Sequence, residues 1–406
     1  MSGTALSLDT IRALFPPTTG DPAFDPELIK RNVERLVTTP TVNTGHAFLD
    51  LSVRTGLAFV DATFQGDHPK YGVKHYAEAR HEAFPPTIVA AVDALSAWGL
   101  GARAAQLFRY WLKTFVRADG TIDYYGPALS EYGQLLHTAA LLQERAGLEG
   151  WWKEGSGALK RMAERLVELC VQSEKGGELI PGVPEADISS GEPLHIHDST
   201  HSENNRYFHN SAWVARGLLR WVELVQRAGT DADRRNCARV RKAAEGLAAR
   251  TLSAVERAWP NDLSDWWLPP QVEACPRPGS LTENALASYT NYRYWPELLS
   301  SGVLPAKLAN RIVDARLSAG GQFCGMTRFA GHLDDWPLAD YLYGLWSLGR
   351  KRDFLLSLYG HVAYHQAQGH LTAYEQVSFP PGTEKAPYCL PCQLVAARAA
   401  RLLVKG

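Results

Sequence analysis

The sequence is poor in cysteine and has no excess of charge of either sign. Six cysteines among 406 residues are too few for a disulfide-stabilised scaffold, so we expect reduced thiols and a cytoplasmic location. The 42 basic and 43 acidic residues leave a formal net charge of −1. Lys and Arg are spread along the chain rather than clustered, so no nucleic-acid surface is expected.

Long apolar runs and phosphate-binding glycine loops are also missing. No run approaches the roughly 18 apolar residues that a membrane-spanning helix needs, and the N-terminal stretch lacks a signal-peptide pattern. No Gly-x-Gly loop follows a strand, which disfavours a nucleotide-binding fold. Strand signals are nearly absent as well, because only residues 48–63 indicate a small β-hairpin.

Helical patterns that come in pairs fill most of the chain. Residues 208–228 and 337–349 are apolar most of the way round, as in buried helices, whereas residues 231–258 carry a single apolar stripe. Buried helices that alternate with amphipathic ones predict two concentric rings, an all-α (α/α)6 toroid that forms a single domain over residues 1–406. The expected helices are 26–37, 86–98, 101–117, 127–146, 155–173, 208–228, 231–258, 282–299, 305–318, 337–349, 351–366 and 391–404. We expect helix 391–404 to pack beside helix 26–37.

Two glutamates lie on the loops that such a toroid gathers at one end. Glu203 directly precedes a buried helix, where partial burial would favour a general acid, although a helix cap is an equally good interpretation. Asp198 in the same loop is the reserve candidate. Glu375 lies among aromatic residues in the loop that leads to the last helix, which suits a general base; the alternative is a solvated loop glutamate.

Metal and redox chemistry have weaker signals. His195, His197 and His201 have a spacing that can bind a metal, but no ligand from another element supports it. Cys389 and Cys392 form a C-x-x-C pair at a helix start, without the context of a redox domain, so packed thiols are favoured. We therefore expect no metal and no cofactor.

Other loops carry residues typical of sugar binding. Arg328, Asp335 and Trp336 combine polar groups with a ring that can stack on a sugar, although an Arg–Asp ion pair with Asp335 as a helix cap is the alternative. The further candidates for substrate binding are Tyr76, Arg80, His81, Tyr125, Asn204 and Tyr207.

Across about residues 70–404 the order of these segments resembles the glucoamylase family and its relatives, the six-hairpin (α/α)6 glycosidases. The matching segments are Tyr76 to Phe84, Gly126-Pro127-Ala128-Leu129, Glu203 with Tyr207 and Phe208, Trp336-Pro337, and Tyr374-Glu375-Gln376. The resemblance implies Glu203 as general acid, Glu375 as general base and a carbohydrate substrate. Where the family has the Asp of its Arg-Asp pair, this chain has His81, which suggests a substrate other than starch.

Four kinds of function fit a toroid of this type. The favoured one is an inverting glycoside hydrolase, because Glu203 and Glu375 precede the third and sixth inner helices and should be widely separated. A polysaccharide lyase using Tyr207 and His209, with Asn204 or Asn205 and Arg206, is the second. A sugar epimerase that works through His is the third. A non-catalytic or prenyl-cyclising toroid is the fourth, and the lack of an Asp-rich helix motif disfavours a cyclase.

Overall fold

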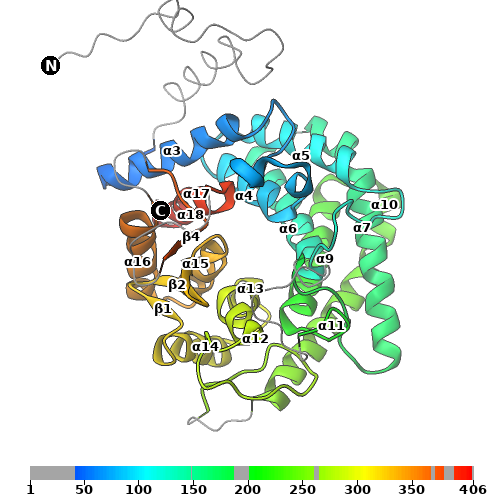
Figure 1. The fold of residues 1–406 in the computed structure, drawn as a ribbon. Coiled ribbons are helices and arrows are strands. Elements are labelled where there is room, and N and C mark those ends of the chain that lie inside the picture. Colours follow the sequence, from blue (N-terminus) through cyan, green and yellow to red (C-terminus); the bar gives the residue numbers. More distant parts are fainter. Residues whose placement is uncertain are drawn as a thin grey trace, which may run out of the picture.

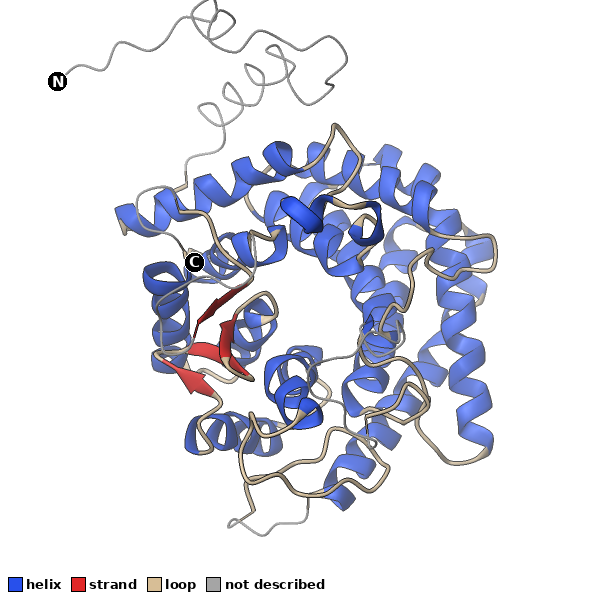
Figure 2. Cartoon of the chain, viewed as in Figure 1, coloured by secondary structure: helices blue, strands red, loops and turns tan. Residues whose placement is uncertain are grey.

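The computed structural model describes residues 42–147, 149–186, 201–259, 265–366, 371–378 and 388–404. Helices dominate this part of the chain and form two concentric rings around a common axis (Figure 1; Figure 2). The predicted (α/α)6 toroid is thereby confirmed. The expected helix 26–37 lies outside the described residues, and the extent of the domain, 1–406, stays a prediction.

The inner ring consists of the helices that the sequence predicts to be buried. They are α4 (Pro85–Ala97), α6 (Leu129–Ala146), α9 (Phe208–Ala228), α12 (Ala285–Tyr289) with the π-helical η3 (Thr290–Tyr294) and α13 (Trp295–Ser301), α15 (Leu338–Ser347), and α17 (Leu390–Gln393) with α18 (Val395–Leu403). Each contacts the next, and α18 returns to α4. The closing contact is reinforced by the Trp98 indole N–H, which donates to the Ala397 carbonyl at 2.7 Å.

The outer ring consists of amphipathic helices, each of which packs on an inner neighbour. They are α3 (Ala47–Thr63), α5 (Gly101–Phe115), α7 (Glu149–Lys175), α10 (Asp231–Arg235) with α11 (Cys237–Ala258), α14 (Ala306–Ser318), and α16 (Lys351–Gly360) with the π-helical η4 (His361–His365). In α11 the buried side chains recur every three or four residues, for example Val240, Ala244 and Leu247. This single stripe is the pattern that places a helix on the outside.

The β-hairpin predicted at residues 48–63 is wrong, because this segment is α3. Its β-branched and aromatic residues suggest strands, but the buried positions Ser52, Val53, Gly56, Leu57 and Val60 have helical spacing. In the described part of the chain, α3 is the outer helix that packs against α18 (Figure 1). A Cβ at Gly56 would lie only 3.0 Å from the Gln393 carbonyl oxygen, so glycine permits this close approach.

A small antiparallel sheet, absent from the predictions, lies at the mouth of the ring. Its strands are β1 (Gln322–Phe323), β2 (Met326–Phe329), β3 (His332–Asp334) and β4 (Gln376–Ser378), in that order. The pairing of β3 with β4 joins two segments that are far apart in sequence and sets Asp334 opposite Gln376. The sheet thereby fixes the backbone directly after Glu375.

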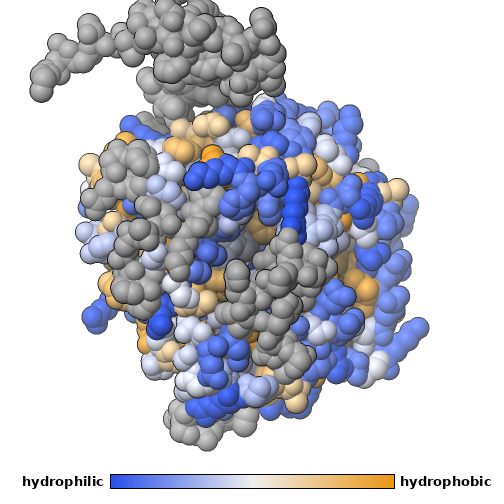
Figure 3. Space-filling model, in the orientation of Figure 1, coloured by the Kyte–Doolittle hydropathy of each residue, from blue (hydrophilic) through white to orange (hydrophobic). Residues whose placement is uncertain are grey.

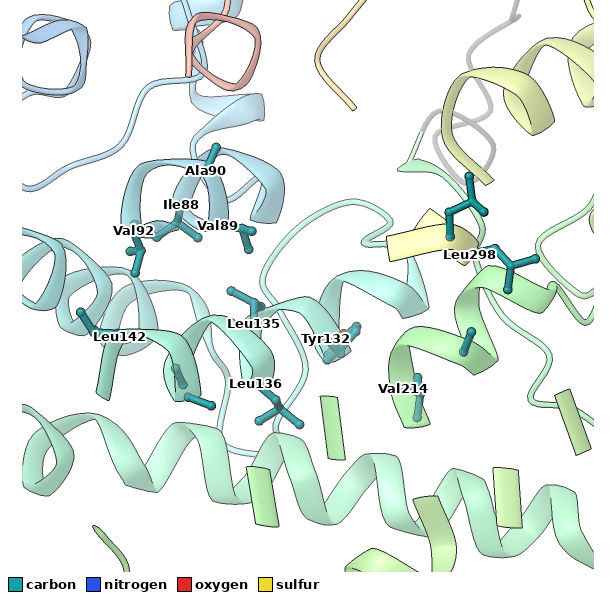
Figure 4. Close-up of a cluster of buried hydrophobic side chains, with 14 of the residues drawn as sticks. Ile88, Val89, Ala90, Val92, Tyr132, Leu135, Leu136, Leu142, Val214 and Leu298 are labelled. Carbon is teal, nitrogen blue, oxygen red and sulfur yellow. The ribbon is translucent and has the colours of Figure 1, made fainter. Parts of the chain in front are cut away.

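The core lies between the two rings and between neighbouring inner helices. Figure 4 shows one part of it, where Ile88 and Val92 of α4 lie close to Leu135 and Leu142 of α6. Helices α6 and α9 approach so closely that a Cβ at Gly133 would lie 2.0 Å from the Trp213 carbonyl oxygen. Glycine at this crossing is therefore required for the inner ring to close.

Hydrophilic and hydrophobic residues are interspersed over the face of the molecule drawn in Figure 3, between the atoms shown in grey. Among the described helices, none has the length and apolar character that crossing a membrane requires.

Candidate active site

Buried aromatic side chains gather where the inner helices begin. The aromatic floor, as we call this group, consists of Tyr71, Phe84, Tyr207, Tyr289, Tyr292, Tyr294 and Trp336. The Trp336 ring lies 5.6 Å from that of Phe84 and 5.8 Å from that of Tyr292, centre to centre. Because the loops before the inner helices converge here, the floor is bordered by their polar residues, an arrangement typical of carbohydrate sites.

Glu375 lies at the edge of the aromatic floor with both carboxylate oxygens engaged. The Tyr71 hydroxyl donates to Oε1, and the Tyr76 hydroxyl donates to Oε2. The two tyrosine rings pack edge to face at 4.8 Å. The side chain of Glu375 is thus held in one orientation by two phenols from a single loop.

Burial gives Glu375 an unusual acidity. Only 8% of the residue is exposed, and this desolvation raises the carboxyl pKa from 4.5 to about 7, although the hydrogen bond from Tyr71 opposes the increase. A carboxyl group with a pKa near neutrality exchanges protons readily at physiological pH. This property is expected of a general acid or base.

Buried polar groups from the last helices hold the segment that carries Glu375. Gln393 accepts a hydrogen bond from the Ala373 N–H and donates to the Leu371 carbonyl, both at 2.8 Å. His365 Nε2 lies 2.6 Å from the Tyr374 carbonyl oxygen. These contacts fix the backbone up to Tyr374, and the pairing of β3 with β4 fixes it directly after Glu375, so Glu375 projects from a rigid support.

Four residues predicted to bind substrate come together beside Glu375. The His81 ring lies 5.6 Å from the rings of both Tyr71 and Tyr76. Arg80 is exposed, and its guanidinium lies over the Tyr125 ring at 4.4 Å. The structure thus groups Tyr76, Arg80, His81 and Tyr125 at the border of the aromatic floor, as expected for residues that contact one ligand.

Arg328, Asp335 and Trp336, which the sequence suggests as a group of sugar-binding residues, lie in different environments. Of the three, only Trp336 belongs to the aromatic floor. Asp335, directly after β3, is fully buried, accepts from the Thr327 N–H at 2.9 Å and lies 3.0 Å from His361 Nδ1. Burial raises the pKa of the Asp335 carboxyl, but the neighbouring His365 and His361 lower it by more. The pKa therefore lies below its ordinary value. Arg328 donates to the Gly320 carbonyl at 2.9 Å. The contacts of Asp335 join it to the sheet and to η4, and those of the half-buried Arg328 join β2 to the turn at Gly320. Substrate binding by either residue stays a prediction.

The predicted acid Glu203 occupies an exposed turn between His201 and α9. Tyr207 is fully buried beneath the turn and donates from its hydroxyl to the Ser202 carbonyl at 2.8 Å. Asn204 is exposed and donates from its backbone N–H to Ser202 Oγ at 3.2 Å. Tyr207 therefore positions the turn, and Glu203 and Asn204 are free of the core. Asp198, His195 and His197 lie outside the described residues.

A buried charge cluster beneath the floor escaped the sequence-based prediction. Arg293 of η3 is fully buried and forms ion pairs with Glu131, Glu185 and Glu297, the first and last at 2.6 Å. Burial raises the pKa of Glu131 to about 8 and also raises that of Glu297, although Arg293 opposes both increases. The available signal was an arginine in the aromatic-rich helical segment 285–299, because a charge that such a segment buries requires partners.

The cluster supports the aromatic floor from below. The Arg293 guanidinium lies 5.2 Å from the centre of the Trp336 ring. Glu185 is 5% exposed and accepts a hydrogen bond from the Ala186 N–H at 2.9 Å. Glu185 thus brings a second carboxylate to the floor, from the loop that follows α7.

The thiols and histidines of the described residues show no metal-binding arrangement. Cys389 and Cys392 are fully buried, and burial raises the pKa of both thiols. Cys392 donates to the Tyr374 carbonyl at 3.1 Å, so this pair packs behind Glu375. Of the three histidines whose spacing suggests a metal site, His201 is the one that the structure describes. Its Nε2 lies 2.6 Å from the Tyr294 hydroxyl.

Comparison with solved structures gives the fold a clear set of relatives. A glycosidase variant in complex with glucose superimposes with a TM-score of 0.59 at 13% identity, covering 88% of this chain and 97% of the other. An unsaturated glucuronyl hydrolase specific for heparin superimposes with a TM-score of 0.56 at 12% identity, with the same coverage of both chains. A bacterial glucoamylase complexed with acarbose superimposes with a TM-score of 0.58 at 11% identity, covering 93% of this chain and 59% of the other.

All three relatives are glycoside hydrolases by name, and this similarity places the chain in the (α/α)6 fold that they share. No protein-family model matches the sequence, and no curated protein matches it either.

Proposed function

We propose that the protein is a glycoside hydrolase in which Glu375 acts as the general base. The observation that carries this proposal is the geometry of Glu375: a buried carboxyl group with a pKa of about 7, held by Tyr71 and Tyr76 at the edge of an aromatic floor. The names of the structural relatives support the same reaction class. The substrate is a carbohydrate that stacks on the aromatic floor.

In this mechanism ionised Glu375 removes a proton from a water molecule as the water attacks the anomeric carbon. Tyr71 and Tyr76 donate to the carboxylate and orient it, and the hydrogen bond from Tyr71 limits the increase in its pKa. A second carboxylic acid protonates the leaving oxygen from the opposite side of the sugar. Helices α9 and α17–α18 are the third and sixth members of the inner ring, so an acid near the start of α9 would approach the sugar from the side opposite to Glu375. This arrangement favours inversion at the anomeric carbon.

Glu203 is the proposed general acid, because it immediately precedes α9 and its turn is held by Tyr207. Its exposed position leaves it accessible to the leaving group of a bound glycoside. Glu185 is the second candidate, since its carboxylate is buried beside the aromatic floor. Its carboxylate is engaged in the ion pair with Arg293, so it is less free than Glu203 to meet a leaving group.

The substrate differs from the terminal α-glucose of starch. The family that the sequence resembles has an Asp where this chain has His81, which packs against Tyr71 and Tyr76. The next residue, Glu82, does not replace the missing carboxylate, because it forms ion pairs with Lys70 and His68. The polar contacts to the sugar ring therefore differ on this side of the site.

A panel of nitrophenyl glycosides and reducing oligosaccharides tests the proposal. Wild-type protein should cleave at least one, and Glu375→Gln should lose the activity while keeping its fold. Glu203→Gln should lose activity on oligosaccharides but retain it on glycosyl fluorides, whose leaving group needs no protonation. If Glu185→Gln shows that pattern instead, Glu185 is the acid. Failure of every glycoside to react would contradict the proposed reaction class.

A lyase or epimerase that uses Tyr207 and His209 has less support. The Tyr207 hydroxyl is engaged with the turn at Ser202, and His209 is buried in a stack with the Tyr294 ring at 4.3 Å. Burial lowers the pKa of His209 well below its usual value. A product that absorbs in the ultraviolet would identify a lyase and exclude hydrolysis.

A further inference from the structure

A second cavity lies inside the ring, on the other side of the aromatic floor. It has a volume of about 250 Å³ and is lined by residues from the inner helices α4, α6, α9, α13, α15 and α17–α18. Trp336 forms part of its wall as well as part of the floor, so the indole separates this cavity from the site of Glu375. At the opposite end the wall includes the exposed Ser347, the last residue of α15. The cavity is therefore reached from the end of the toroid away from Glu375.

Positive charge predominates in this cavity. Arg145, Arg216 and Arg398 contribute three guanidinium groups from three helices. Asp93 accepts from Arg145 at 2.7 Å and from Arg398 at 2.8 Å, which offsets the effect of burial and holds its pKa well below the usual range. The other lining carboxyl, Asp340, has a pKa raised by burial and accepts from Ser300 at 2.8 Å.

Arg216 is the cation without a matching carboxylate. Among the residues that the structure describes, no carboxylate lies within ion-pair distance of its guanidinium, and its Nε has no hydrogen-bond partner. Burial lowers the Arg216 pKa and the neighbouring Arg220 lowers it further, against a smaller opposing effect of Glu223 and Glu144, both of which pair with Arg220. His137, also in the wall, has a pKa lowered to about 3 by burial and then by the positive charge of Arg216. The imidazole is therefore neutral at physiological pH, and the net charge of the cavity remains positive.

Polar side-chain atoms that line the cavity lack hydrogen-bond partners within the described residues. The Trp213 indole Nε1 has none, although the residue is only 5% exposed, and His137 Nδ1 has none either. The two rings pack edge to face at 5.5 Å. A buried polar group without a partner costs about 1–3 kcal/mol, so several around one cavity indicate a polar occupant.

We propose that this cavity is a second ligand site, which binds a small oxyanion through Arg216 and Trp213. A phosphate, sulfate or carboxylate group supplies the negative charge and the acceptor oxygens that the wall lacks. The volume admits a free oxyanion or a monosaccharide that carries one. Arg145 and Arg398 remain engaged with Asp93, and so they shape the site while Arg216 provides the charge that pairs with the ligand.

The site is tested by isothermal titration of wild-type protein with inorganic phosphate, and separately with glucuronate and with glucose, at constant ionic strength. We expect phosphate or glucuronate to bind and glucose not to bind. Stronger binding of phosphate points to a free or phosphorylated ligand, and stronger binding of glucuronate points to a sugar acid. Both outcomes support an oxyanion site.

Matched variants separate this site from non-specific binding. Arg216→Gln should weaken binding about tenfold or more, because a charge-assisted hydrogen bond is lost, and Trp213→Phe should weaken it several-fold. Arg227→Gln is the control, since Arg227 belongs to the same helix but pairs with Glu144 at the surface. Equal affinities of the Arg216 and Arg227 variants, or no binding by the wild type up to about 50 mM, would overturn the proposal. Thermal unfolding of each variant verifies its fold.

Discussion

Replacing Glu375 with Gln should make the protein more stable at neutral pH and not at acid pH. Burial raises the carboxyl pKa from 4.5 to about 7, so between these values the folded state binds a proton that the unfolded state releases. The wild-type free energy of unfolding therefore decreases as pH rises through this window and stays lower above it. A pKa difference of about 2.5 corresponds to ~3 kcal/mol, and an amide, which does not titrate, avoids this loss.

Thermal unfolding of wild type and Glu375→Gln at several pH values between 4 and 8.5 measures this effect without any substrate. For a chain of this length ~3 kcal/mol corresponds to about 3 °C. The gain of the variant over wild type should therefore grow by about that amount between pH 4.5 and pH 8. Glu203→Gln, at the exposed turn before α9, is the matched substitution outside the buried position of Glu375. A Glu375→Gln difference that does not change with pH would refute the claim that Glu375 titrates near neutrality.

Three further predictions concern the site and its support. Tyr71→Phe removes a hydrogen bond that lowers the Glu375 pKa, so the acidic limb of kcat/KM should move about 1–2 pH units upward. Tyr359→Phe, at an exposed position of the outer helix α16, should leave the pH profile unchanged. Arg293→Met leaves buried carboxylates unpaired and should lower the free energy of unfolding by about 3–5 kcal/mol in chemical denaturation; a loss below 1 kcal/mol would contradict the buried charge cluster. Gly133→Ala should destabilise by more than about 2 kcal/mol because its Cβ meets the α9 backbone, whereas Gly150→Ala has free space and should stabilise slightly.

Much of the ring architecture could be predicted from the sequence, because burial leaves a periodic record. Helices α9 and α15 are apolar most of the way round, and α11 carries one stripe, so their inner and outer places follow. The prediction for α3 was wrong because burial leaves a weaker pattern in its sequence. Its buried positions include Ser52 and Gly56, which do not look apolar, and its Val and Phe residues suggest strands. Tertiary packing against α18 decides its conformation.

The site could be predicted only where a loop residue had distinctive neighbours. Glu375 stands out because tyrosine and phenylalanine flank it, and the structure places it at the aromatic floor. The ion pairs of Arg293 could not be predicted, since Glu131 and Glu185 come from distant segments that only the closed ring brings together. Asp335 shows the converse. It lies in a segment whose residues are typical of a sugar site, but directly after β3 its carboxylate is engaged by the Thr327 N–H and His361.

The most direct test of the central claim is the rate at which Glu375→Gln cleaves the best glycoside of the panel, relative to wild type. Loss of a general base reduces the rate by about 10²–10⁴-fold. We therefore predict a loss of at least about 100-fold in kcat, with the variant at least as stable as wild type at pH 7.5. A kcat within about tenfold of wild type would show that Glu375 is not the base.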